Sequence, residues 1–391
     1  MEGITLKPGW KMARFGDVVR QCKEKVDRDN NPFERYVEGG HMDSENIHIR
    51  RWGEFGMDYV GPAFHRIFRK GQVLYGSRRT YLKKVALAEF DGITANTTFV
   101  CETIDQKVFL QELLPFLMLT DSFTEHSIRE SKGSTNPYIN WPDIAKYEFP
   151  LPPLDEQKRI AEILWAADEV AEQWQQVSNI LDLLMSVYRF ELFSNNIWPK
   201  TKLKNIFSVQ LGKMLSPKAK TGISLYPYLA NYNIQWDRID LEKIQEMDFS
   251  EREREKFNLL KGDILVCEGG EVGRSAIWHG EIEHCYYQKA LHRLRPISNF
   301  SSEIMLQFMV WADRKGIFKA LTGHSTIAHL TAIKLKEVSV PVPSDKEQVR
   351  MEHVFKEMKS VKSDVNKQIS KAIKFKQSLL CSLLSIGIPD V

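Results

Sequence analysis

Seven basic side chains lie within nineteen residues that contain no acid, at Arg66, Arg69, Lys70, Arg78, Arg79, Lys83 and Lys84. Glycine, serine, threonine and tyrosine residues separate them. Cations interleaved with small polar and aromatic residues are typical of surfaces that contact phosphate. The alternative interpretation is a solvated face of a β-hairpin, and a basic run alone does not exclude it.

Two short motifs suggest enzymes, and neither is complete. Asn136-Pro137-Tyr138 resembles the catalytic Asn-Pro-Pro-Tyr of adenine methyltransferases but lacks the second proline. No glycine-rich strand–turn–helix that would bind S-adenosylmethionine lies at a plausible distance from it. The segment Gly269–Gly273 suggests a nucleotide-binding loop, but no Gly-Lys-Ser/Thr follows it. A loop between two strands is the better interpretation.

The composition is that of an ordinary soluble protein. The chain has 391 residues, of which 43% are hydrophobic and 27% charged. Five scattered cysteines never form a Cys-x-x-Cys, which favours reduced thiols and predicts no metal site. The first residues do not resemble a signal peptide, and the longest apolar run, Phe109 to Leu119, is too short to span a bilayer. We therefore expect a cytoplasmic chain. No spacing of side chains marks a catalytic set.

The sequence repeats itself at a distance of about 191 residues. Proline-rich segments at 150–153 and 341–343 are each followed by Glu-Gln and by a long, charged stretch with periodic apolar residues. Upstream, 70–74 matches 261–265, 133–135 matches 324–326, and Trp10 corresponds to Trp198. A repeat of this length indicates two whole domains, each followed by a long helix. We predict domains at 1–150 and 195–344, and helices at 151–194 and 345–391.

Apolar residues of the two long stretches step alternately by three and four positions, the pattern of a coiled coil. The predicted pairing residues are Ile160, Ile163, Val170, Trp174, Val177, Leu181 and Leu184 in the first helix, and Met351, Val354, Met358, Val361 and Val365 in the second. Ser344 and Glu347 form a predicted capping box. The first stretch has a net charge of −5 and the second of +3. Opposite charges favour pairing within the chain, and an antiparallel arrangement is sterically easiest. The alternative is two ordinary core helices.

The predicted fold class is α+β. Short β-like runs alternate with helical runs and frequent turn signals in both domains. The fold is therefore two pseudo-repeated α/β domains, each followed by a long helix, with the helices forming an antiparallel coiled coil.

At this point the residues resemble the specificity subunits of type I restriction–modification systems, over essentially the whole chain. The segments that carry the resemblance most specifically are the two proline-rich leads into the helices, 151–160 and 342–348, and the runs 71–79 and 262–270, which look like core strands of that family's target recognition domains.

The resemblance implies two DNA-reading domains at opposite ends of a helical spacer, each reading half of a bipartite target in double-stranded DNA. It implies a chain of a bacterium or archaeon that is not itself an enzyme and binds no cofactor. Methyl transfer would belong to two modification subunits with S-adenosylmethionine. Cleavage would belong to a restriction subunit that uses ATP and Mg. The resemblance also makes the helices a ruler, so that removing one heptad from each should shorten the unread gap.

For such a reader we predict two kinds of DNA contact. Phosphate contacts supply affinity and register, and we assign them to Arg66, Arg69, Lys70, Lys83, Lys84, Lys213, Lys218, Lys220, Lys289 and Arg293. Base contacts supply specificity, and Arg78, Arg79 and Arg274 could each pair bidentately with guanine. The remaining predicted DNA-facing residues lie on loops: Ser77, Lys132, Ser134, Thr135, Gly269, Gly270, His324, Ser325 and Thr326.

The two domains differ at nearly every predicted reading position, since Ser77-Arg78-Arg79 corresponds to Glu268-Gly269-Gly270. This difference predicts an asymmetric target. Two rival functions remain open: a coiled-coil adaptor whose domains bind proteins, and a free-standing adenine methyltransferase.

Overall fold

The computed structural model describes residues 6–27, 30–57, 60–195, 197–216, 221–322 and 329–384. The chain divides into two compact units. The first unit comprises residues 1–175 and 367–391, and the second comprises residues 176–366. The helices α5 (Leu154–Ser194) and α10 (Asp345–Leu384) each contribute to both units.

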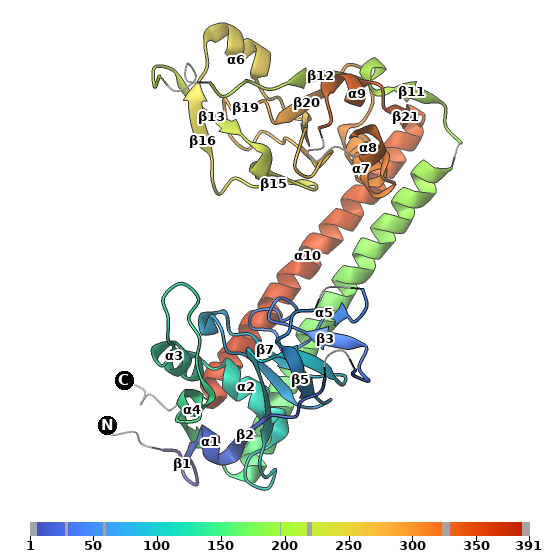
Figure 1. Cartoon of the computed structure of the whole chain (residues 1–391). Helices are drawn as coiled ribbons and strands as arrows, with labels where there is room; N and C mark the ends of the chain where they lie inside the picture. Colours follow the sequence, from blue (N-terminus) through green and yellow to red (C-terminus); the bar gives the residue numbers. More distant parts are fainter. Residues whose placement is uncertain are drawn as a thin grey trace. The chain divides into compact units, whose positions relative to one another are not determined.

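The first unit is a mixed α+β structure (Figure 1). Its elements before α5 are β1 (Lys11–Arg14), α1 (Phe15–Val18), β2 (Val19–Cys22), β3 (Arg35–Val37), β4 (Gly53–Glu54), β5 (Phe64–Phe68), β6 (Val73–Gly76), η1 (Thr80–Leu82), β7 (Val85–Leu87), β8 (Gly92–Ala95), β9 (Thr98–Thr103), η2 (Gln111–Leu113), α2 (Leu114–Leu119), α3 (Asp121–Arg129), α4 (Trp141–Ile144) and β10 (Glu148–Leu151).

The second unit repeats this plan. Its elements between α5 and α10 are β11 (Lys200–Lys202), η3 (Leu203–Asn205), β12 (Phe207–Leu211), β13 (Leu225–Leu229), η5 (Asn231–Asn233), β14 (Ile234–Gln235), β15 (Arg238–Ile239), β16 (Gln245–Asp248), α6 (Glu251–Phe257), β17 (Ile264–Cys267), β18 (Ser275–Ile277), β19 (Tyr286–Tyr287), β20 (Leu291–Pro296), α7 (Ser302–Arg314), α8 (Ile317–Thr322), α9 (Ala332–Lys336) and β21 (Ser339–Pro341).

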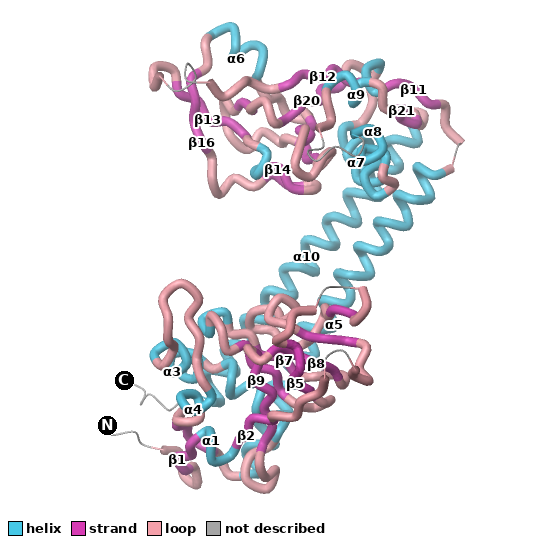
Figure 2. Tube along the Cα trace, viewed as in Figure 1, coloured by secondary structure: helices cyan, strands magenta, loops and turns pink. Residues whose placement is uncertain are grey.

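Two sheets of the first unit have counterparts in the second, and Figure 2 shows the strands of both units in magenta. A four-stranded sheet of order β2-β9-β6-β7 in the first unit matches β12-β20-β17-β18 in the second. The two-stranded sheet β1-β10 matches β11-β21, which places each proline-rich lead next to the start of its domain. A further sheet differs, being β4-β3-β8-β5 in the first unit and β16-β13-β19 in the second.

The repeated Trp, Glu and Gln make the same contacts at the start of each long helix. The indole of Trp10 donates to Glu156 at 2.8 Å, and that of Trp198 donates to Glu347 at 3.1 Å. Gln157 donates to the Pro152 carbonyl at 2.9 Å. In the second unit, Gln348 Nε2 donates to the Pro343 carbonyl at 3.1 Å. The repeat therefore preserves the hydrogen bonds that connect each domain to the start of its long helix. The predicted capping box is confirmed, because Ser344 Oγ accepts from Glu347 N and Ser344 N donates to the Glu347 carboxylate at 2.8 Å.

Within each unit α5 and α10 lie side by side and antiparallel (Figure 1). The ion pairs Asp168–Lys376, in the first unit, and Asp182–Lys362, in the second, run in opposite order along the two helices. These pairs join the acidic helix to the basic one, as the charge pattern predicts.

The contact face of α5 differs from the predicted one. Val170, Trp174, Val177 and Leu184 are 36–49% exposed, and Val361 of α10 is 48% exposed, so their assignment to the pairing face is wrong. Ile163, Leu181, Val354 and Met358 are partly buried, whereas Ile160, Met351 and Val365 are buried. Six buried positions of α5 fall one residue later than the predicted seam: Leu164, Asp168, Ala171, Ser178, Met185 and Arg189.

The physical reason is that α5 has two faces with heptad spacing. Small side chains such as Ala171 and Ser178 allow close packing, and the buried charge of Asp168 is paired across the seam. The hydrophobic pattern alone does not distinguish this face from the more apolar one beside it. No helix in the described part of the chain has the length and hydropathy of a membrane span.

Candidate nucleic-acid interface

In the first unit, two segments predicted to face DNA are joined by backbone hydrogen bonds. We call residues 77–84, between β6 and β7, the arginine turn, and residues 131–139 the polar loop. Arg79 N donates to Pro137 O at 2.6 Å, and Ile139 N donates to Ser77 O at 2.9 Å. The polar loop closes on itself, since Lys132 N donates to Tyr138 O at 2.8 Å. The tertiary structure thus brings together residues about sixty positions apart.

Two strained residues shape the arginine turn. Arg79 (φ 49°, ψ 56°) and Lys83 (φ 47°, ψ 49°) have left-handed backbones on either side of the single turn η1. This conformation is unfavourable for residues other than glycine and is often found at functional sites. The turn that they bracket holds the Tyr81 side chain 53% exposed. Tyr138 of the polar loop is 41% exposed.

The guanidinium groups of Arg78 and Arg79 are available for a ligand. Both residues are exposed, and neither side chain forms a hydrogen bond or ion pair with the residues that the structure describes. Lys132 is also exposed but pairs with Asp143 at 3.0 Å. Ser134 and Thr135 lie exposed on the polar loop, whereas Ser77 is buried and donates to the Thr97 carbonyl at 2.7 Å.

The other predicted cations of this unit do not form one free basic surface. Arg69 pairs with Glu24 at 2.7 Å and Asp91 at 3.2 Å. Lys84 donates to the Gly39 carbonyl, and burial lowers the pKa of Arg66. Lys70 is exposed.

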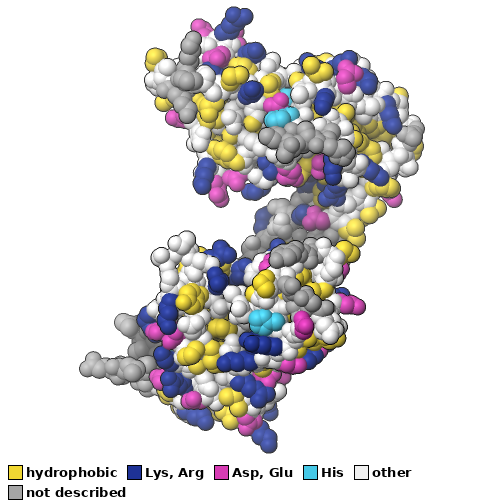
Figure 3. Space-filling model, in the orientation of Figure 1, with side chains coloured by type: hydrophobic (Ala, Val, Ile, Leu, Met, Phe, Trp, Pro, Cys, Tyr) yellow, Lys and Arg dark blue, Asp and Glu magenta, His cyan; other side chains and the backbone are white. Residues whose placement is uncertain are grey.

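Lys83 is also occupied, pairing with Asp121 at 2.6 Å and Glu45 at 3.0 Å. Arg69 and Lys83 of the acid-free stretch are therefore neutralised by acids from elsewhere in the unit. Figure 3 agrees, since basic side chains on its visible face are interspersed with acidic and apolar ones.

The corresponding segment of the second unit is the glycine loop, residues 268–274, between β17 and β18. Leu330 N donates to Glu268 O at 2.8 Å, the counterpart of the bond between Ile139 and Ser77. Gly273 has φ +86°, and a Cβ there would lie 2.3 Å from the Phe318 ring. Glycine is therefore required for packing at this position. The segment is a loop between two strands, as predicted.

Side chains fix the glycine loop from both sides. The Trp236 indole donates to Glu271 at 2.7 Å, and Asn231 Nδ2 donates to the Gly269 carbonyl at 3.2 Å. Arg274 donates to Glu271 at 3.0 Å and to the Asn231 carbonyl at 3.0 Å. Its side chain is only 15% exposed. The prediction that Arg274 pairs with guanine is therefore wrong for this arrangement, because both of its terminal guanidinium nitrogens already donate to partners within the unit.

Two further predicted phosphate contacts of the second unit are wrong. Lys213 is 9% exposed, and its ammonium donates to the Asp248 carbonyl at 2.5 Å and to Glu253 at 2.7 Å. Arg293 is 7% exposed and donates to the Asn258 carbonyl at 2.7 Å. Both cations stabilise their own domain. Lys289 is exposed, as are Gly270 and the aromatic ring of Tyr232.

The model of the type I restriction modification DNA specificity domain matches the chain twice, at residues 8–179 and 195–374. The chain belongs to this family. It is 28% identical over 200 residues to the type I restriction enzyme EcoDI specificity subunit of Escherichia coli, a match covering 48% of this chain and 43% of that protein. It is 22% identical over 426 residues to the MjaVIII specificity subunit of Methanocaldococcus jannaschii, covering 97% and 94%. The matches cover less than half the length of the EcoDI subunit and of another relative, the putative MjaX specificity subunit of Methanocaldococcus jannaschii.

Solved structures share the fold. A chain from a structural study of complex assembly and conformational transition of the type I R-M system aligns with a TM-score of 0.61 and 20% identity, covering 98% of this chain and all of that one. The type I restriction–modification S subunit of M. genitalium aligns with a TM-score of 0.55 and 16% identity, covering 100% and 98%.

For this specificity-domain chain, several predicted contacts lie outside the described residues. They are Lys218, Lys220, His324, Ser325 and Thr326. The predicted site residues leave out the exposed Tyr81 and Tyr138, although the sequence places Tyr81 among the cations of the acid-free stretch. An aromatic side chain between cations is a signal for stacking on bases.

The buried thiols of Cys267 and Cys285 do not have the lowered pKa of a nucleophile. Burial raises the pKa of Cys267 to about 11 and that of Cys285 to about 12. A reactive cysteine has the opposite shift. The described residues contain no group of three or more His, Cys, Asp or Glu side chains that could hold a metal ion.

Proposed function

We propose that this chain is the non-catalytic DNA-recognition subunit of a type I restriction–modification complex, and that it reads an asymmetric bipartite target. The proposal rests on one observation: the two units share the same sheets and helix-start contacts but present different loops. Matching sheets and matching Trp–Glu and Gln–carbonyl contacts hold a turn with two free arginines in one unit and a glycine loop in the other.

The arginine turn supplies the chemistry to read the first half-site. Arg78 and Arg79 are exposed and carry forked donors that match the two major-groove acceptors of guanine. Ser134 and Thr135 lie on the adjoining polar loop. Lys70, exposed beyond β5, is a candidate for a phosphate contact in this unit.

The glycine loop reads the second half-site in a different way. Its backbone at Gly269 and Gly270 carries no side chain, so bases can approach closely, and Tyr232 lies exposed on the neighbouring η5. Lys289 is the exposed candidate for phosphate. Because the two loops have different donors, their half-sites differ in sequence.

Methylation and cleavage belong to partner subunits in this proposal. Two modification subunits bind S-adenosylmethionine, a restriction subunit uses ATP and Mg, and this chain binds none of these cofactors. One exposed apolar stripe of α5 in the second unit supports docking of a partner. Its members, Ile180, Leu183, Val187 and Phe190, are 45–64% exposed and follow the spacing of one helix face.

Co-expression with the cognate modification subunit, followed by sequencing of methylated adenines, tests the proposal. We expect one motif of two unlike half-sites separated by a fixed unread gap. A palindromic motif would contradict asymmetric reading. Binding of S-adenosylmethionine by the isolated chain would favour the free-standing methyltransferase, and absence of salt-dependent duplex binding with the modification subunit would favour the protein adaptor.

A further inference from the structure

A buried charge cluster joins the first recognition domain to both long helices. Asp168 of α5 is 2% exposed. Its Oδ1 accepts from Lys376 Nζ of α10 at 2.7 Å, and its Oδ2 lies 2.7 Å from His48 Nε2 of the domain. We call these three residues the Asp168 cluster. They come from a loop of the domain and from two helices, which are far apart in the sequence.

The charges around His48 favour its protonated form. The hydrogen bond to Asp168 raises the pKa of His48 to about 9, with a further contribution from Glu89, which lies 2.9 Å from Nδ1. Glu172, one helical turn after Asp168, adds a second acid and pairs with Arg50. Burial alone would raise the pKa of Asp168, but His48 and Lys376 lower it. The cluster is therefore a carboxylate held between two cations.

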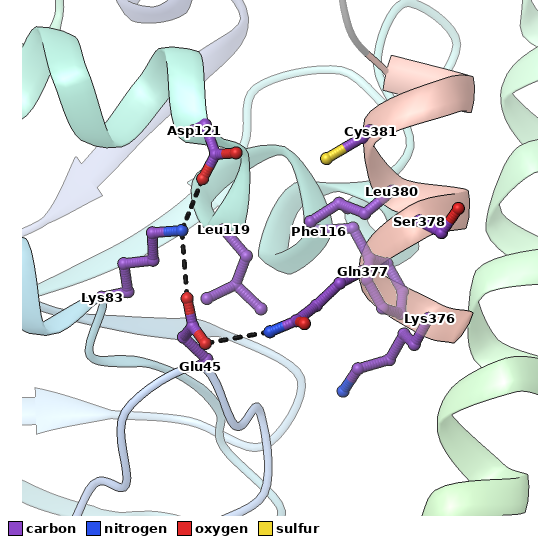
Figure 4. A pocket seen from close by; sticks show the side chains of 10 residues that line it. All are labelled: Glu45, Lys83, Phe116, Leu119, Asp121, Lys376, Gln377, Ser378, Leu380 and Cys381. Atoms are coloured by element: carbon purple, nitrogen blue, oxygen red, sulfur yellow. Dashed lines mark hydrogen bonds and ion pairs between the residues drawn. The ribbon is translucent and has the colours of Figure 1, made fainter. Parts of the chain in front are cut away.

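A second set of contacts links the cluster to the arginine turn (Figure 4). Glu45 accepts from Lys83, at the end of the turn, and from Gln377, which adjoins Lys376 on α10; both distances are 3.0 Å. Glu45 N also donates to the Lys83 carbonyl at 3.1 Å. These side chains line a cavity of about 380 Å³ between the turn and α10. The position of the turn is thus tied to the helices through residues 45–48.

The second unit has a cluster at the equivalent helix position with the opposite charge. Lys359 of α10 is the repeat counterpart of Asp168. Its ammonium donates to Asp237 at 2.8 Å and lies 2.7 Å from Glu303. Asp237 precedes β15, close to the repeat equivalent of His48. The first domain therefore places a basic group against the acid of α5, and the second domain places acids against the base of α10.

We propose that the Asp168 cluster is a positioning device that holds the first recognition domain at one angle on its helices, and thereby fixes the gap between the half-sites. The proposal rests on the proposed function. Buried ion clusters contribute little net stability compared with apolar packing, but they can select one arrangement among several. Without the cluster, the domain would pack on the helices in more than one orientation, and targets with gaps changed by one base pair would be accepted.

The test uses the complete complex with modification subunits. It measures how strongly methylation depends on the number of base pairs between the two half-sites. The first variant, Asp168→Asn, leaves the buried Lys376 without its counter-charge and removes one of the two acids beside His48. The triple variant His48→Leu/Asp168→Leu/Lys376→Met removes all the charges and retains apolar packing. His48→Gln keeps the Asp168–Lys376 pair and changes a partly exposed side chain, so it folds even if the others do not. Arg20→Gln is the control, since it breaks an exposed pair with Glu102 that involves neither helix.

We expect methylation at targets with a shifted gap, relative to the native gap, to rise on the order of tenfold in the triple variant. A smaller rise is expected in His48→Gln, and none in Arg20→Gln. The half-site sequences should stay unchanged. A merely structural role would lower methylation at all targets alike. If the folded triple variant still methylates only targets with the native gap, the proposal is overturned. If the wild-type complex reads no bipartite motif, the proposed function is overturned instead.

Discussion

The arginine turn and the glycine loop occupy equivalent places in equivalent sheets, yet they present opposite kinds of surface. The arginine turn has a strained backbone and leaves two guanidinium groups without a partner among the described residues. The glycine loop ties its arginine to Glu271 and Asn231 and uses Gly273 to pack against Phe318. The comparison shows that the frame constrains where a reading loop begins and ends, and not which groups it offers.

The largest expected effect is on the arginine turn. Replacing both Arg78 and Arg79 by alanine should lower methylation of the native target about 100-fold, because two forked donors to bases are lost. Methylated-adenine sequencing should also show relaxed sequence at the first half-site only. Arg69→Ala is the matched control, since Arg69 is already paired with Glu24 and Asp91. Equal losses in both variants would contradict the distinction between free and paired arginines.

The next effect concerns the glycine loop. Gly273→Ala should destabilise the second unit by about 2–4 kcal/mol, because the new methyl group meets Phe318 in a left-handed backbone. Gly280→Ala is a control in the same unit, with φ +91° and open space around the added Cβ. Thermal unfolding of the two variants separates the steric contribution from backbone strain. Equal thermal unfolding midpoints for Gly273→Ala and Gly280→Ala would show that packing against Phe318 does not require glycine at position 273.

A pH-dependent difference between the units follows from His48. Its pKa in the folded chain, about 9, is above the ordinary 6.5, so the stabilisation is fully present below 6.5 and is lost as pH rises through 9. After allowance for solvent screening we expect the first unit to lose about 1–2 kcal/mol between pH 6 and pH 10. Urea unfolding at the two pH values measures this. His48→Gln should remove most of the dependence, and an unchanged dependence would assign it to other groups.

The smallest effect sharpens the comparison of the two helix starts. Ser344→Ala removes the capping hydroxyl of α10 and should cost about 1 kcal/mol of unfolding free energy. The first helix has Pro153 at the corresponding position and no such hydroxyl. Pro153→Ala therefore serves as the comparison, measured by the same denaturant titration. If Ser344→Ala loses no more unfolding free energy than Pro153→Ala does, the capping role of Ser344 is contradicted.

The frame could be predicted from the sequence because its signals are local. Proline-rich leads, the Ser344–Glu347 box and long amphipathic periodicity each specify a helix and its start. The contact face of α5 could not be predicted, because Val170 and Trp174 fit a heptad as well as the buried Ala171 and Ser178 do. Likewise, Lys213 and Arg293 are ordinary basic residues in sequence, and only the fold shows that both are buried with internal partners.

The sequence by itself determined the doubling of the chain, the α+β class, the opposite charges of the helices and the family that the residues resemble. These properties follow from periodicity, composition and repeated motifs, which need no knowledge of distant contacts. Only the tertiary structure decided which cations are free, which helix face is buried and which domain charge meets Asp168 or Lys359. Those outcomes depend on side chains from remote segments, since each charge is neutralised or left exposed by whatever packs against it.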